Sequence, residues 1–495
     1  MSAHDAVTAL RRFGLGARPG ELARIAGDPR GFVLQSLTDP GRARIDDPAL
    51  EPSHVVFAAA MEAQRRQRLA RANPAAQDGG AIMRDGAGDG SAQRAGAAPS
   101  PSMPPAARGA EAAPGNKAAT AAPAKAGEIR REAFVEEAGA RFRHAATTDA
   151  AYLERLVMFW SNHFCVSANK GPVRGIAGAF EREAIRPHVL GTFTDMLLAV
   201  EKHPAMIVYL DNQVSVGPGS PAGTNRNLGL NENLAREILE LHTLGVDGGY
   251  SQADVTNFAR ILTGWTVGNL VNARSEPGKF FFAPARHEPG EWAVHGKRYP
   301  ARGLETGEAV LRDLALHPAT ARHIAKKLAR HFVAEEPPPA LVARLERTFL
   351  DTRGNLAALA KALAQSEEAW QVAPTKVLPP YDFLVAVLRG LSLEPRPPEL
   401  LRLSAMLGEP LWRPPSPAGW PDADTTWAAP SALRERLRIA EVAARQADRL
   451  SDPRKVVDDL FGEAVGPATR QAVARAETRE QGLELLIMSP DFQRR

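Results

Sequence analysis

The segment 231–245 (NENLAREILELHTLG) holds the densest group of side chains that could do chemistry. On a helix, Asn233, Glu237 and Glu240 lie close together, because residues three and four apart are neighbours. Their oxygen atoms suit a hard divalent cation that takes its remaining ligands from another segment. We therefore predict Asn233, Glu237 and Glu240 as metal ligands. The alternative is a solvated helix face with an ion-pair ladder of Glu232, Arg236 and Glu240.

Two histidines add acid–base groups to this segment. His242 projects near the apolar face of the same helix, and His163 lies in the aromatic segment 159–164 (FWSNHF). Together with Glu237 they are the predicted catalytic residues, because imidazoles and carboxylates are the usual general acids and bases. At ~100° per residue, Glu237 and His242 lie about 140° apart on the helix, so we do not expect them to share one metal ion. The alternative is that both histidines are buried, hydrogen-bonded core residues.

A Pro/Trp-rich loop at 411–430 contains three of the seven tryptophans of the chain. Prolines stiffen a loop and can hold aromatic rings in place. Trp412, Trp420 and Trp427 are therefore the predicted substrate-binding residues, on a lid or wall over a cleft where Asp422 and Asp424 offer carboxylates. The alternative is a long loop that its tryptophans pin onto the helical body.

Helices must position all of these groups. Apolar residues recur at helical spacing through most of the chain, which predicts a mainly α, multi-helical globular body. Ser251 and Asp254 form a capping box that starts a helix, and Gly245 ends the helix before it. Alternating and aromatic residues near 279–299 predict a small β-hairpin or ribbon.

Composition divides the chain into four parts. Residues 1–72 are predicted N-terminal helices, and 73–127 are a disordered insertion rich in Ala, Gly and Pro, without an apolar stripe. Residues 128–303 are a predicted central helical domain with the 231–245 motif and the ribbon. Residues 304–495 are a predicted C-terminal helical domain that carries the Pro/Trp loop.

Charge and cysteine content exclude several classes. The net charge is +4. The sequence contains no cluster of Lys and Arg interleaved with aromatic residues, so we do not predict nucleic-acid binding. The single cysteine, Cys165, excludes an intramolecular disulfide and a cysteine-based metal cluster. No apolar run is long enough for a membrane span, and the Arg11-Arg12 pair is not followed by the apolar region of a signal peptide. We expect a soluble protein that is cytoplasmic or is exported with a signal-bearing partner.

Several segments together resemble the bacterial family named domain of unknown function 1800. They are RFGLG (12–16), FWSNHF (159–164), RPHVLG (186–191), HPAM (203–206), YLDN (209–212), GLNENLAREILELHTLGVDGG (229–249), ARILTGW (259–265) and GWP (419–421). The resemblance covers most of the chain outside 73–127. It implies no particular reaction. It does imply a partner, because members are often encoded beside a sulfatase- or alkaline-phosphatase-like protein with a twin-arginine signal.

Two functions follow as hypotheses. The first is an enzyme, hydrolytic or oxidative, with a Glu/His site in a cleft between the helices 153–164 and 231–245; its cofactor is unknown, and a divalent metal is the candidate. The absence of Gly-x-Ser-x-Gly, phosphate-loop and dinucleotide motifs argues against the common serine hydrolases, P-loop NTPases and nicotinamide dehydrogenases. The second is a non-catalytic scaffold or maturation partner of the exported sulfatase- or phosphatase-like protein.

Overall fold

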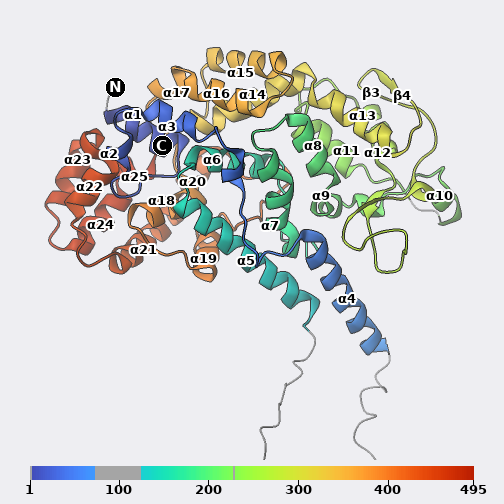
Figure 1. Cartoon of the computed structure of the whole chain (residues 1–495), viewed down its shortest axis with the longest axis horizontal. Coiled ribbons are helices and arrows are strands. Elements are labelled where there is room, and N and C mark those ends of the chain that lie inside the picture. Colours follow the sequence, from blue (N-terminus) through green and yellow to red (C-terminus); the bar gives the residue numbers. More distant parts are fainter. Residues whose placement is uncertain (1–2, 73–123, 227–228) are drawn as a thin grey trace, which may run out of the picture.

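Helices make up most of the regular structure in the computed structural model, which describes residues 3–72, 124–226 and 229–495. The mainly α fold predicted from the apolar spacing is confirmed (Figure 1). The predicted insertion at 73–127 lies outside the described residues except for its last four, where a helix begins at Ala126. No helix of the described part is long and apolar enough to cross a membrane.

The first half of the chain contains short helices around two long ones. Its helical elements are α1 (Ala3–Thr8), η1 (Ala9–Phe13), α2 (Glu21–Ile25), α3 (Pro29–Gln35), η2 (Pro40–Ala43), α4 (Ser53–Ala72), α5 (Ala126–Thr147), α6 (Ala151–His163), η4 (Arg174–Ile176), α7 (Ala177–Phe180), η5 (Glu181–Ile185), η6 (Arg186–His188), α8 (Phe193–Lys202), α9 (Pro204–Tyr209), η7 (Asn212–Val214), α10 (Pro221–Arg226), α11 (Asn233–Glu237) and η8 (Ile238–His242).

The second half begins with the β-structure and continues as helices. Its elements are α12 (Gln252–Leu262), β1 (Trp265–Val267), β2 (Phe280–Phe282), η9 (Pro284–Arg286), β3 (Trp292–Val294), β4 (Lys297–Tyr299), α13 (Leu304–Ala315), α14 (Pro318–Phe332), α15 (Pro339–Asp351), α16 (Leu356–Gln365), α17 (Glu368–Gln371), α18 (Pro380–Gly390), α19 (Pro397–Met406), α20 (Asp424–Trp427), α21 (Pro430–Gln446), α22 (Pro453–Phe461), η10 (Gly462–Ala464), α23 (Pro467–Ala474), α24 (Arg479–Met488) and α25 (Pro490–Gln493).

The β-structure consists of two separate antiparallel pairs. β3 pairs with β4, as predicted near 279–299, with Trp292 opposite Tyr299. β2 does not join them; it pairs with β1, with Trp265 opposite Phe282. The sequence pattern missed β1, which has only three residues and is separated from the end of α12 by two residues.

One hydrophobic core includes buried side chains from Ala6 near the N-terminus to Phe492 near the C-terminus. α6 lies within it, with Leu156 and Trp160 almost inaccessible to water. The adjacent Arg11 and Arg12 are buried as well, and they donate hydrogen bonds to carbonyl groups of the C-terminal half. Arg11 reaches the Phe492 carbonyl oxygen at 2.5 Å, and Arg12 reaches that of Ala369 at 2.7 Å. These contacts join the two ends of the chain (Figure 1).

Three helical turns in the described residues are π-helical: η1, η5 and η8. A π-helical turn hydrogen-bonds residue i to residue i+5, and such turns occur frequently at functional sites. η5 contains the buried Glu181 and is followed by the buried Arg186, and η8 contains the buried His242. Compared with an α-helix, these π-helical turns change which side chains lie on the same side of the helix.

Candidate functional site

The C-terminal end of α6 holds the Pro/Trp loop in place. The Asn162 side chain accepts a hydrogen bond from the backbone N–H of Trp420 at 2.7 Å and donates one to its carbonyl oxygen at 2.9 Å. Gly419 has φ +84°, and a Cβ atom there would lie 2.5 Å from the Asn162 carbonyl oxygen. Glycine is therefore required for the loop to approach the helix this closely.

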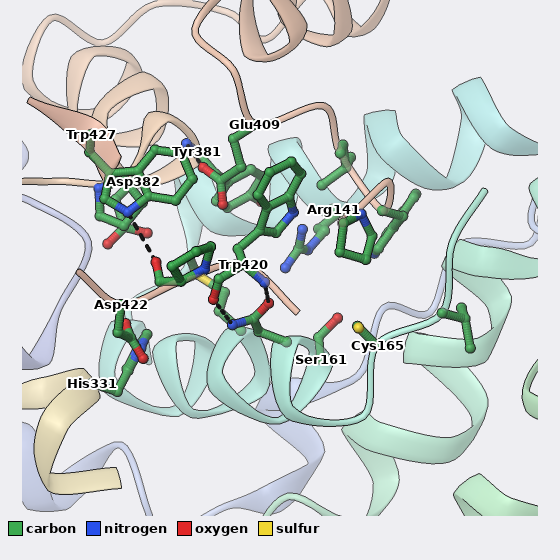
Figure 2. A pocket seen from close by; sticks show the side chains of 18 of the residues that line it. Arg141, Ser161, Cys165, His331, Tyr381, Asp382, Glu409, Trp420, Asp422 and Trp427 are labelled. Atoms are coloured by element: carbon green, nitrogen blue, oxygen red, sulfur yellow. Dashed lines mark hydrogen bonds and ion pairs between the residues drawn. The ribbon is translucent and has the colours of Figure 1, made fainter. Parts of the chain in front are cut away.

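A small pocket of about 90 Å³ lies between α6, the start of α18 and this loop. All three predicted substrate-binding residues, Trp412, Trp420 and Trp427, line it. In Figure 2, Trp420 lies near the centre of the group, with Glu409 and Tyr381 on one side and Ser161 and Cys165 on the other. The loop is thus both pinned to the body and part of a pocket wall, which combines the two alternatives that the sequence left open.

Two of the three tryptophans are fixed by their indole N–H groups. Trp412 donates to the Glu181 carboxylate at 3.3 Å, and Trp427 donates to the Pro421 carbonyl oxygen at 3.2 Å. Trp420 lies 5.9 Å from Trp427 between ring centroids. These contacts make the pocket wall a preformed aromatic surface.

Glu409 is the titratable group of the pocket that most resembles a general acid. Its carboxylate accepts one hydrogen bond, from the Tyr381 backbone N–H at 2.8 Å. Burial raises the pKa of Glu409 to about 8. The carboxyl group therefore keeps its proton at neutral pH, as a proton donor must. The Tyr381 hydroxyl nearby is buried and has no hydrogen-bond partner among the described residues.

A second carboxylate, Asp422, has the opposite character. It lies 3.0 Å from the Nδ1 atom of His331, and Lys376 lies 4.0 Å away. Burial lowers the pKa of His331, so this contact is an ion pair only while His331 is protonated. His331, helped by Lys376, outweighs the effect of burial and holds the pKa of Asp422 well below its usual range. At neutral pH Asp422 is therefore ionised while Glu409 is protonated.

Cys165 lines the same pocket but does not have the properties of a nucleophile. Its thiol donates to the Pro417 carbonyl oxygen at 3.3 Å. Burial raises the pKa of Cys165 to about 12, whereas a nucleophilic cysteine needs a lowered pKa.

A buried ion-pair network lies beneath the aromatic wall. Arg186 is completely buried and contacts Glu154 at 2.7 Å and Glu181 at 2.8 Å. Glu181 and Arg186 are five residues apart, across the π-helical turn η5. Arg141 also contacts Glu181, at 3.1 Å. The network anchors Trp412 through Glu181 and so supports the pocket.

The predicted catalytic residue His163 is buried and does not line the pocket. Its Nε2 atom lies 3.2 Å from the backbone carbonyl oxygen of His242, and its Nδ1 atom accepts from Lys327 at 3.0 Å. Burial and the Lys327 ammonium lower the pKa of His163. Neutral His163 is thus held between α14 and η8 directly behind the pocket.

His242 is buried too, and its Nδ1 atom lies 2.8 Å from the carboxylate of the fully buried Glu201. Its Nε2 atom has no hydrogen-bond partner among the described residues. The rings of His163 and His242 are 6.3 Å apart between centroids. The structure therefore brings the two predicted imidazoles together and adds Glu201 and Lys327 to them.

The third predicted catalytic residue, Glu237, lies half-buried at the end of α11. Burial raises the pKa of Glu237, and the charges of His242 and Glu240 act on it. The expected 140° separation of Glu237 and His242 does not hold, because η8 is a π-helical turn and five residues span about one turn of it. The two groups lie closer around the helix axis than on an α-helix.

The predicted metal ligands Asn233, Glu237 and Glu240 have different surroundings. Asn233 is exposed, and Glu240 accepts a hydrogen bond from the Tyr250 hydroxyl at 3.3 Å. In the part of the chain that the structure describes, no group of three or more His, Cys, Asp or Glu side chains could hold a metal ion. The set Asn233, Glu237 and Glu240 stays a prediction.

Sequence reasoning missed Glu409, Tyr381, Glu201 and Lys327. Glu201 and Lys327 lie 41 and 164 residues along the chain from the histidines that they contact, and Glu409 lies 28 residues from Tyr381, so no short sequence pattern joins them. Asp422 was visible in the sequence as a candidate carboxylate, because it follows a tryptophan and a proline in the Pro/Trp loop.

The segments that carry the family resemblance meet in space. FWSNHF contacts GWP through Asn162 and Trp420, and it contacts NENLAREILELHTLG through His163 and His242. Neither the curated proteins nor the solved structures contain a significant match to the chain. A family model described as "Protein of unknown function (DUF1800)" matches residues 8–494. Because this match spans nearly the whole sequence, the chain belongs to the DUF1800 family.

Proposed function

We propose that this chain is a hydrolytic enzyme that binds its substrate in the pocket under the Pro/Trp loop and protonates it from Glu409. The observation that carries the proposal is a carboxyl group with a pKa of about 8 in an aromatic pocket. An apolar pocket with a few polar groups and a strongly perturbed titratable residue is the usual form of an active site.

The pairing of Glu409 with Asp422 supports acid–base hydrolysis. Two carboxyl groups whose environments push their pKa values apart can divide the roles of proton donor and charged stabilising group. Glu409 would protonate the leaving group, and the ionised Asp422 would stabilise positive charge that develops on the substrate. The attacking water would then give a proton to the Glu409 carboxylate, which restores the acid. Lys376 and His331 keep Asp422 ionised and oriented for that role.

The aromatic walls favour a substrate with a flat or apolar face, such as a sugar or aromatic ring. A cationic ligand is disfavoured, because Arg141 already lies against two of the aromatic rings. Its guanidinium carbon is 4.4 Å from the Tyr381 ring centroid and 5.6 Å from that of Trp412. Trp420 and Trp427 offer the remaining ring surfaces.

In this proposal His163, His242 and Glu237 are positioning residues. Lys327 links them to the pocket, because it donates to His163 and the charge of Asp422 acts on it. Metal binding by Glu237 is not required for the proposed steps and would be a separate property of the chain.

The test combines a titration with an activity screen. In protein labelled with ¹³C at the glutamate carboxyl carbons, one resonance should titrate near pH 8 and disappear in Glu409→Gln. A screen of alkyl glycosides and alkyl esters, whose alcohol leaving groups must be protonated, should find a substrate whose kcat falls about 10²- to 10⁴-fold in Glu409→Gln. A Glu409 resonance that titrates near pH 4 to 5 would contradict the proposal, as would an activity that Glu409→Gln retains.

The alternative, a non-catalytic partner of an exported sulfatase- or phosphatase-like protein, stays a prediction. It separates cleanly from the enzyme proposal, because co-purification with such a protein should be the same in wild type and Glu409→Gln.

A further inference from the structure

α4 and α5 form an antiparallel arm that projects from the body (Figure 1). The 20 residues of α4 are roughly 30 Å long at 1.5 Å per residue. At the base, Ser53 donates to Glu183 through both its backbone N–H and its hydroxyl, at 2.8 and 2.6 Å. Towards the end, a small hydrophobic cluster of Ala60, Ala63, Ala126 and Ile129 joins the two helices. The arm is thus an ordered element that presents its tip away from the core.

The tip of this arm, defined as residues 61–72 and 124–132, is strongly basic. It carries seven Arg and Lys residues against three Glu residues, a net charge of +4. The net charge of the whole 495-residue chain is also +4. The excess positive charge of the protein therefore equals the charge of these 21 residues, and the rest of the chain is balanced.

Several of these cations have no acidic partner in the described chain. Glu62 pairs with Arg65 at 2.9 Å and with Arg66 at 3.8 Å. No carboxylate of the described residues pairs with Arg68, Arg71 or Arg131, and all three are exposed. Arg71 and Arg131 also line one open hollow between the helices, together with Lys125. An anionic partner would meet a group of unneutralised charges here.

We propose that the tip of the arm docks on an anionic lipid surface. A basic cluster near a bilayer is attracted to acidic headgroups by about 1 kcal/mol per Lys or Arg. Because the cluster sits at the end of a projecting rod, a flat surface can contact it without touching the body of the protein.

The apolar residues of the tip favour lipid over nucleic acid. Leu69 is 59% exposed and lies directly beside Arg68. An aliphatic side chain among basic residues is what an interfacial helix inserts at the headgroup boundary. The tip contains no Phe, Tyr or Trp on which bases could stack. A narrow tip also offers few phosphate contacts to a duplex, whereas mobile acidic lipids can gather around it.

The test is sedimentation of the full chain with vesicles made of equal parts phosphatidylcholine and phosphatidylglycerol. Wild type should bind them, should not bind vesicles of phosphatidylcholine alone, and should dissociate as the salt concentration rises from about 0.05 to about 0.5 M. Each arginine removed should lower the partition coefficient about fivefold. The tip variant Arg68→Gln/Arg71→Gln/Arg131→Gln should therefore bind about 100-fold more weakly.

A matched control carries the same change of charge elsewhere. Arg347→Gln/Arg449→Gln/Arg475→Gln removes three exposed arginines far from the arm along the chain and should bind like wild type. Circular dichroism and thermal melts should match for the three proteins, because all six side chains are at the surface. The proposal is overturned if wild type does not bind the acidic vesicles, if the control loses as much binding as the tip variant, or if a DNA duplex binds the tip while vesicles do not.

Discussion

At the scale of single residues, the most informative group is Glu409. A carboxyl group that stays protonated in the folded chain and ionises in the unfolded chain makes stability depend on pH. Its folded pKa of about 8 lies above the ordinary value of 4.5. The cost of keeping it buried is absent below pH 4.5 and grows as the pH rises towards 8.

We expect Glu409→Gln to remove this dependence. Between pH 4.5 and 8 the unfolded wild type releases a proton that the folded protein keeps, so the free energy of unfolding falls as the pH rises. The amide has no such proton, and its advantage over wild type should reach on the order of 4 kcal/mol at pH 8. Urea unfolding at pH 5, 6.5 and 8 measures the difference. The exposed Glu394→Gln is the control and should follow wild type, and a constant offset for Glu409→Gln at all three pH values would contradict the assignment.

At the scale of elements, the sequence predicted local structure well where local rules decide it. The capping box is confirmed: the Ser251 backbone N–H donates to Asp254 at 2.7 Å, and Ser251 accepts from the Asp254 backbone N–H at 3.3 Å. Gly245 has φ +84°, but the helix already ends at His242 with Thr243 as its C-cap, so Gly245 lies in the turn that follows. Trp412, Trp420 and Trp427 were found from their density in one stiff loop.

The sequence failed where backbone periodicity changes. A helical wheel at ~100° per residue assumes α-helix, whereas 238–242 forms a π-helical turn. No local residue pattern predicts that π-helical turn. Its residues make buried contacts with distant segments, such as the contact of His242 with Glu201. The partners Glu201 and Lys327 come from α8 and α14, which only tertiary packing brings to η8.

The Pro/Trp loop should depend on a single side chain. Asn162→Ala removes both hydrogen bonds to Trp420, so we expect a loss of about 2 kcal/mol, at roughly 1 kcal/mol per bond. The loop should also loosen, which acrylamide quenching of tryptophan fluorescence would detect. Asn257→Ala is the matched control, because Asn257 also bonds a distant backbone carbonyl, that of Ala293 at 2.9 Å. Unchanged quenching in Asn162→Ala would show that the loop is held by its rings alone.

At the scale of the whole molecule, one hydrophobic core includes described residues from both ends of the chain. α18 packs on α5, α13 packs on α8, and α2 packs on α22. Arg389 of α18 donates to the Gly16 carbonyl oxygen at 2.8 Å and pairs with Glu21 at 3.1 Å. The predicted boundary between domains 128–303 and 304–495 was based on composition and periodicity. Neither property shows whether two segments bury each other's apolar faces.

This shared core leads to a prediction about fragments. Residues 304–495, expressed alone, should fail to fold, because α18 would lose the buried surface that α5 provides and Arg389 would lose Gly16 and Glu21. An unpaired buried arginine alone costs roughly 3 to 5 kcal/mol, a large share of the 5 to 15 kcal/mol that typically holds a protein together. Far-UV circular dichroism and a ¹H–¹⁵N spectrum of the fragment measure this. The control is the same fragment mixed with residues 1–303, which should recover dispersed resonances. A dispersed spectrum and a cooperative melt for 304–495 alone would instead establish it as an independent domain.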